Sequence, residues 1–168
     1  TGVASDSARA DAPPPGIADN APSLWLVSAH GIGPVSAGMR FNVAAPLLGV
    51  PASAGTGNQV CAYVRPAHGP AGVSLMVRGG EVARVQVDSG DVRTTEGARI
   101  GDSEARIDSL YAGRVASSPH KYTSGHYLTV KPAGGESPYR LVFETDGERV
   151  TRYRAGRLPE VEWVEGCS

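Results

Sequence analysis

Histidines, serines and glycine-rich turns are the features of this 168-residue chain that could support catalysis or metal binding. His120 and His126 lie close in sequence, but no HExxH pattern, paired cysteine or acidic cluster at ligand spacing accompanies them. No serine lies in a Gly-x-Ser-x-Gly motif, and residues 31–34 lack the third glycine and the lysine of a phosphate-binding loop. We therefore expect no enzyme activity, no catalytic residue, no metal and no cofactor.

Three glutamates near the C-terminus, Glu160, Glu162 and Glu165, are of a type that can serve as general acid and base. They are interleaved with apolar residues, a pattern typical of a strand with one solvated face. We therefore expect residues 160–165 to form a strand whose charges keep its edge from pairing further.

Arginines and tyrosines gather just before this segment, and both residue types dominate the hot spots of protein interfaces. On a strand, Arg152 and Arg154 point to one face and Tyr153 to the other. The group is either a binding patch or an ordinary solvated sheet face with Tyr153 in the core. Together with nearby aromatic and loop residues, the candidate binding residues are Tyr122, His126, Tyr127, Tyr139, Arg140, Arg152, Arg154, Arg157, His68 and Glu136.

The elements that must position these residues are predicted twice, each time as a short helix followed by a β-meander. The matching segments are 38–49 and 101–113, 60–66 and 126–132, and the turns 79–81 and 146–148. We expect an α+β fold of two tandem repeats, residues 24–94 and 95–168. Each repeat is a short helical segment packed on an antiparallel three- to four-stranded sheet.

The first helix is predicted over residues 40–48, although Pro46 lacks the N–H that a helix interior uses. Its expected buried face is Phe41, Ala44, Ala45, Leu47 and Leu48, and Gly49 ends it. The second helix should begin at the N-cap Asp102 and bury Ala105, Ile107, Leu110 and Tyr111. Strands are predicted over 59–65, 73–78, 81–88, 126–131, 139–145 and 148–155.

Composition and charge limit the environment of the chain. Sixteen basic and seventeen acidic residues are spread along the sequence, so no basic stripe indicates nucleic acid. No apolar run reaches membrane-spanning length, and residues 1–23, rich in Ala, Ser, Asp and Pro, are predicted to be a flexible tether. Cys61 and Cys167 are predicted to form one disulfide in an oxidising compartment, and the alternative is two unlinked thiols in the cytosol.

Gly38 and Met39, the short helix, then Leu47, Leu48 and Gly49 followed by a three-stranded meander resemble a known domain. It is similar to the domain of the small lipoprotein of the outer-membrane β-barrel assembly machine, which the secreted β-lactamase inhibitor proteins carry in tandem. The resemblance implies two helix-plus-sheet units whose sheets form a concave face. In the inhibitors, that face and two loops grip an enzyme, and an acidic loop residue enters its active site.

The corresponding loops here are residues 66–72, which carry His68 and no acid, and residues 132–138, whose only acid is Glu136. The inhibitors have a disulfide inside each repeat, whereas the two cysteines of this chain lie far apart. The resemblance therefore indicates an interaction scaffold without naming its target.

We expect an exported, non-catalytic binding protein of the periplasm or the inner leaflet of the outer membrane, or a secreted one. A lipid anchor before the tether would be its only membrane contact, and its partner would be an envelope protein, with a hydrolase as the expected target of inhibition. The alternatives are a structural accessory of outer-membrane assembly and a module that binds cell-wall glycan, with Tyr122, Tyr127, His126 and Trp163 as stacking surfaces.

Overall fold

The structure is a computed structural model that describes residues 25–55 and 60–167. The predicted tether and Gln59 lie outside these residues. The elements are β1 (Val27–Ser28), β2 (Gly31–Ile32), β3 (Val35–Ser36), α1 (Phe41–Leu48), η5 (Ala52–Gly55), β4 (Cys61–Val64), β5 (Val73–Arg78), β6 (Glu81–Val87), α2 (Glu104–Leu110), β7 (Val115–Pro119), β8 (His126–Val130), β9 (Tyr139–Thr145), β10 (Val150–Arg157) and η6 (Glu160–Glu162).

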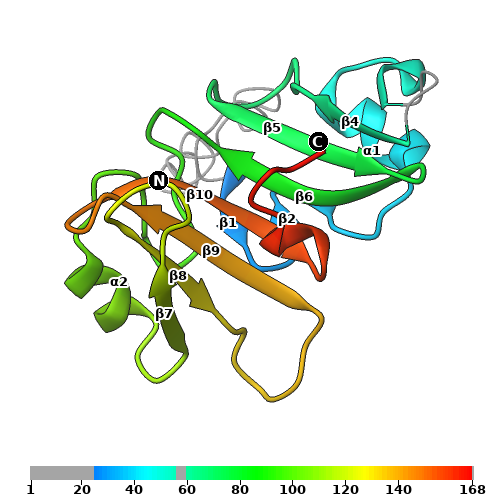
Figure 1. Cartoon of the computed structure of the whole chain (residues 1–168). Helices are drawn as coiled ribbons and strands as arrows, with labels where there is room; N and C mark the ends of the chain where they lie inside the picture. Colours follow the sequence, from blue (N-terminus) through cyan, green and yellow to red (C-terminus); the bar gives the residue numbers. More distant parts are fainter. Residues whose placement is uncertain (1–24, 56–59, 168) are drawn as a thin grey trace, which may run out of the picture.

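A seven-stranded antiparallel sheet in the order β4-β5-β6-β10-β9-β8-β7 forms the body of the protein (Figure 1). β10 pairs with β6 from Tyr153 opposite Val87 to Gly156 opposite Arg84, so the strands of both halves of the chain join in one sheet. A small three-stranded sheet, β1-β2-β3, precedes them. The α+β class is confirmed, while β7 and the small sheet were not predicted.

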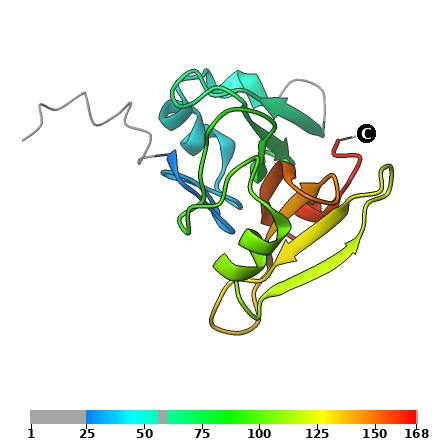
Figure 2. The same ribbon diagram turned by 90° about the vertical axis from the view of Figure 1, so that its left-hand side faces the viewer.

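Both helices and the small sheet lie on one side of the large sheet, and the C-terminal segment lies on the other (Figure 2). Alternate residues of the strands face the helices because side chains on a strand point to opposite faces. They form one core, in which Phe41 and Leu48 of α1, Ile107 of α2, and Phe143 and Tyr153 of the sheet are buried. Among the described residues, no helix is both long and apolar enough to cross a membrane.

α1 continues through Pro46 and ends where predicted, at Gly49, whose φ of 72° is the left-handed conformation that glycine adopts readily. Phe41, Ala44, Ala45 and Leu48 are buried as expected. Leu47, predicted to be buried, is 39% exposed, because it lies away from the stripe that faces the sheet.

α2 begins one residue later than predicted. Its N-cap is Ser103, which has extended backbone angles and whose hydroxyl accepts the N–H of Arg106 at 3.1 Å. The carboxylate of Asp102, the predicted cap, instead accepts the N–H of Arg99 and pairs with the Arg106 side chain. Ala105, expected in the buried stripe, is exposed.

The turns set the strand bounds. Gly79 and Gly80 both have positive φ, as a two-residue hairpin turn requires, and they join β5 to β6 as predicted. β10 begins at Val150 rather than at residue 148. The Asp146 carboxylate accepts the N–H groups of Glu148 and Arg149, and this holds both residues in the turn.

Each helix start is bonded to the hairpin that follows it in the same manner. A glycine with positive φ, Gly38 or Gly101, lies three residues before each helix. At α1, the backbones of Gly38 and Met39 bond to Val82, and that of Phe41 bonds to Gly80. At α2, the backbones of Gly101 and Asp102 bond to Val150, and that of Glu104 bonds to Glu148. The same backbone arrangement thus occurs twice in the chain.

Residues 158–167, here called the strap, cross the sheet face opposite the helices (Figure 1). The prediction of a solvated strand over 160–165 is wrong: residues Glu160–Glu162 form a 3-10 helix that packs on β6, β9 and β10. Glu160 is only 1% exposed, because arginines pair with its carboxylate. The predicted disulfide is confirmed, and Cys167 ends the strap bonded to Cys61 of β4.

Candidate functional site

The sheet face that carries the strap, here called the polar face, presents charged side chains from neighbouring strands. Tyr127 of β8 lies opposite Glu144 of β9, and Glu144 lies opposite Arg152 of β10. Arg154 follows two residues later on the same face, since side chains alternate along a strand. Strand pairing therefore brings together residues that are 27 positions apart in sequence, from 127 to 154.

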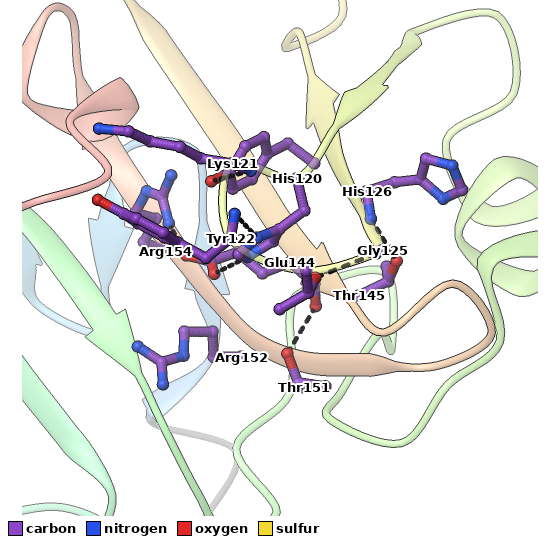
Figure 3. A network of polar contacts seen from close by, with 12 residues as sticks. His120, Lys121, Tyr122, Gly125, His126, Glu144, Thr145, Thr151, Arg152 and Arg154 are labelled. Carbon is purple, nitrogen blue, oxygen red and sulfur yellow. Dashed lines mark hydrogen bonds and ion pairs between the residues drawn. The ribbon is translucent and has the colours of Figure 1, made fainter.

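Glu144 is the centre of this group. One carboxylate oxygen accepts a hydrogen bond from Arg154, and the other lies 2.8 Å from Nε2 of His120 (Figure 3). Burial by itself raises the pKa of Glu144, but the hydrogen bond from His120 and the charge of Arg154 outweigh burial and hold the pKa below its usual value. Glu144 is therefore ionised and paired at neutral pH.

Both ring nitrogens of His120 have partners. The main-chain N–H of Tyr122 donates to Nδ1 at 3.1 Å, so Nε2 carries the hydrogen that Glu144 accepts. The ring also stacks on Tyr127, with 4.6 Å between ring centroids. With both nitrogens engaged in the protein, His120 orients the loop and has no free nitrogen for proton transfer to a substrate.

The loop from His120 to Gly125 is tied to the sheet and to the strap. The N–H of Lys121 donates to the hydroxyl of Tyr127 at 3.1 Å, and Lys121 Nζ lies 2.8 Å from a carboxylate oxygen of Glu165. The hydroxyl of Tyr122 also contacts Glu165. These bonds hold the Tyr122 ring in place although 63% of the residue is exposed.

A hollow of about 300 Å³ lies between this loop, the ends of β9 and β10, and the strap. It is lined by His120, Tyr122, Thr123, Glu144, Thr145, Asp146, Thr151, Arg152 and Val164. The Arg152 side chain is 51% exposed, and its only described ion pair is a 4.0 Å contact with Asp88. The hollow therefore combines a fixed aromatic ring with an arginine that can still bind an anion.

Of the predicted binding residues, Tyr122 and Arg152 line the hollow, while Tyr127 and Arg154 lie in the network beneath it. His126 is on the opposite face of the sheet, where its Nδ1 lies 2.7 Å from Glu104 of α2. Arg157 lies between Glu81 and Glu160 and holds the strap.

The remaining predicted residues are elsewhere. The Tyr139 ring packs against His30, and Arg140 donates to the backbone carbonyls of Ser137 and Tyr139. His68 and Glu136 are exposed. β4 and β8 run in opposite directions in the antiparallel sheet. The loops that follow them, which carry His68 and Glu136, therefore leave the sheet at opposite ends of its strands.

His120, Glu144 and Val164 were not predicted to belong to a binding site. Glu144 had one signal in the sequence, because it is a charged residue directly after the apolar run 141–143 of β9. His120 and Val164 had none, since the hairpin and the strap meet only in the folded chain.

Within the described residues, no group of three or more His, Cys, Asp or Glu side chains could hold a metal ion. No family model, curated protein or solved structure matches this chain.

Proposed function

We propose that the chain is a non-catalytic binding protein of the cell envelope that receives a loop of a protein partner in the hollow. Its expected role is inhibition of a hydrolase. The observation that carries the proposal is that the residues beneath the hollow and the residues at its rim differ in their bonding. Polar groups beneath it, on His120, Glu144 and Arg154, bond to one another, while Tyr122 and Arg152 face outward at its rim.

This arrangement suits binding rather than turnover. A side chain fixed before association loses little conformational entropy when a partner arrives. Tyr122 is fixed by its contacts with His120 and Glu165, and its ring offers a large apolar surface. Arg152 offers a bidentate site for a carboxylate, so the partner loop should carry an acidic residue next to an apolar one.

The proposal includes two tandem repeats, α1 with β4 to β6 and α2 with β7 to β10. The matching backbone bonds at the two helix starts support it, as do the positive φ angles of Gly38 and Gly101. Apolar residues of the helices also correspond, with Ala44 and Leu48 of the first helix answering to Ile107 and Tyr111 of the second. An exported location, with a lipid anchor ahead of residue 1, is part of the same proposal, and the disulfide supports an oxidising compartment.

The test is affinity capture from an envelope extract with the natural chain, Tyr122→Ala and Arg152→Ser as parallel baits. Arg106→Gln, an exposed cation on α2 at the opposite face, is the matched control. A protein captured by the natural chain and the control should be depleted with both rim variants. With the purified partner, each rim variant should bind about 30-fold more weakly, the effect of about 2 kcal/mol at a hot spot. Equal capture by all four baits would contradict the proposal.

A second candidate, glycan binding, is favoured by the exposed Tyr122 ring beside the hydroxyl-lined hollow. The other stacking residues proposed for it have partners already: His120 stacks on Tyr127, Glu104 binds His126, and Arg78 lies over Trp163. Lys121 Nζ lies 5.2 Å from the Tyr122 ring centroid, so a sugar should reach at most the other face of this one ring. Titration with cell-wall fragments, monitored by the NMR chemical shifts of the tyrosines, distinguishes this candidate, because only the signals of Tyr122 should shift.

A further inference from the structure

The strap is held in the way that a bound peptide is held. Arg84 of β6 donates from Nη1 to the main-chain carbonyls of Glu160 at 3.0 Å and Trp163 at 2.7 Å. Arg154 of β10 donates from Nε to the carbonyl of Val161 at 2.6 Å. Two buried guanidinium groups of the sheet thus bind three backbone carbonyls, and such bonds do not depend on the side chains of the bound segment.

Side chains of the strap provide the sequence-dependent contacts. The carboxylate of Glu160 lies 3.0 Å from Arg157 Nη2 and 3.3 Å from Arg78 Nη1. Val161 is completely buried, but it lies outside the main core. The guanidinium carbon of Arg78 lies 4.9 Å from the Trp163 ring centroid. An acidic residue, a small apolar residue and an aromatic residue are therefore recognised in this order.

The groove beneath the strap has an excess of positive charge. Arg84 is 2% exposed, yet its hydrogen bonds go to two carbonyls and to the Gln86 side chain, and its Nε has no hydrogen-bond partner. Burial, and then the charge of Arg154, lower the pKa of Arg84. A buried cation of this kind favours an acidic ligand over a neutral one.

The strap is joined to the sheet by the chain at Arg157 and by the disulfide between Cys167 and Cys61. The disulfide fixes its far end covalently, in addition to the contacts of Glu165 with Lys121 and Tyr122 and the hydrogen bond from the Cys167 N–H to the Tyr63 hydroxyl. A dithiol can open this disulfide in two steps. One of its thiolates attacks a cysteine sulfur to give a mixed disulfide, and its second thiol then attacks the mixed disulfide and releases the cysteine. Two electrons and two protons pass to the cysteines, and the dithiol becomes a cyclic disulfide.

We propose that the groove formed by Arg84, Arg154, Arg78 and Arg157 is a peptide-binding site for acidic-apolar-aromatic segments. The strap occupies it in the oxidised chain. A segment of the same chemistry from another protein takes its place after a dithiol has reduced the disulfide. This groove borders the hollow, since Val164 of the strap lines the hollow and Glu165 contacts Tyr122. The two tests change different residues, Arg84 here and Tyr122 or Arg152 there, so either proposal can fail alone.

The experiment uses the full chain with Cys61→Ser, Cys167→Ser and Val161→Asp, here called the open variant. The two serines remove the disulfide, and the aspartate weakens the binding of the strap in its groove. The probe is a fluorescein-labelled synthetic peptide of residues 158–167 with serine at the last position, and binding is followed by fluorescence anisotropy. We expect saturable binding to the open variant and at least 100-fold weaker binding to the oxidised natural chain.

Two added substitutions test the groove itself. Arg84→Met in the open variant should weaken peptide binding at least tenfold, because it removes two charge-assisted hydrogen bonds. Arg106→Gln, on the other side of the sheet, should change it less than twofold. A probe peptide with Gln at the Glu160 position and Asp at the Val161 position should not bind.

Equal binding to the open and oxidised chains would place the peptide elsewhere and overturn the proposal. So would absence of binding to a folded open variant at 1 mM peptide. If circular dichroism shows that the open variant is unfolded, the proposal is tested instead by hydrogen exchange on the natural chain after its disulfide has been reduced with dithiothreitol. Selective loss of protection over residues 159–166 supports a releasable strap, whereas loss of protection throughout the sheet overturns it.

Discussion

The two faces of the large sheet are buried in different ways. On the helix face, apolar side chains such as Phe143 and Tyr153 form one core with buried residues of α1 and α2. On the polar face, Arg84, Arg154, Glu144 and Glu160 are almost as inaccessible, but each is a charged residue held by hydrogen bonds. Burial of apolar surface is non-directional, whereas burial of a charge requires a partner at a defined position.

The two faces should therefore respond differently to substitution. The helix face should lose stability in proportion to the volume removed. The polar face should lose stability when one member of a pair is removed, and should recover when both members are removed.

The largest effect is expected for Phe143→Ala on the helix face. Phe143 is completely buried between Tyr111 and Tyr153, with ring centroids 5.8 and 5.3 Å away. The substitution leaves a cavity and should lower the free energy of unfolding by about 4 kcal/mol, measured by urea denaturation. Val43→Ala, at a residue 53% exposed, should change it by less than about 0.5 kcal/mol. A similar loss for both would show that the helix face is not a packed core.

Glu144→Gln tests the polar face and should cost about 3 kcal/mol, because Arg154 keeps its buried charge without a carboxylate partner. Replacing both members, as Glu144→Leu with Arg154→Met, should recover at least half of that loss in the same urea experiment. If the double variant loses as much as the sum of the single variants, the pair is not the source of the effect.

Acid should destabilise the polar face, by less than Glu144→Gln does. Burial favours the neutral form of Glu144 and Glu160, but hydrogen bonds from His120 and from Arg157 respectively outweigh it, so both carboxyls have a folded pKa below their usual 4.5. The unfolded state then binds protons first as pH falls, so this stabilisation is present above about pH 4.5 and is lost as pH drops through the folded pKa. Urea denaturation at pH 7, 5 and 3 measures it, and Glu144→Gln should flatten the profile.

The smallest effect is expected for Tyr153→Phe, which keeps the ring in the core but removes the hydroxyl that donates to the carbonyl of Val92 at 2.7 Å. The loss should be about 1 kcal/mol in thermal or urea unfolding. Tyr122→Phe, at the exposed rim, should change stability by less than about 0.5 kcal/mol. Equal losses would mean that the buried hydroxyl contributes nothing that an exposed one does not.

Local sequence patterns predicted β5 and β9 correctly to the residue, as well as the turn at Gly79 and Gly80. They also placed Tyr153 on the face opposite Arg154, because alternation is a property of the strand itself. Leu47 and Ala105 were misplaced at the margins of helix stripes, where the rotation of about 100° between successive residues decides exposure.

The candidate site was predicted only in part. Tyr122 and Arg152 were expected to bind a partner and do lie together at the hollow. Their supports, His120 and Glu144, were not identified, because they meet across 24 residues of sequence through a loop whose path the sequence does not specify.

The α+β class, most strands and turns, most buried apolar residues of the helices and the pairing of two cysteines in one disulfide were predictable from the sequence. These follow from side-chain periodicity and backbone preferences, which act over a few residues. Long-range contacts, which the sequence pattern does not show, join all the strands from β4 onward in one sheet and fold residues 160–165 onto it. The run looked like a solvated strand because its glutamates alternate with apolar residues. Arg84, 76 residues from Glu160, and Arg157 instead hold it on the sheet as a strap with Glu160 and Val161 buried, and only the folded chain brings such partners together.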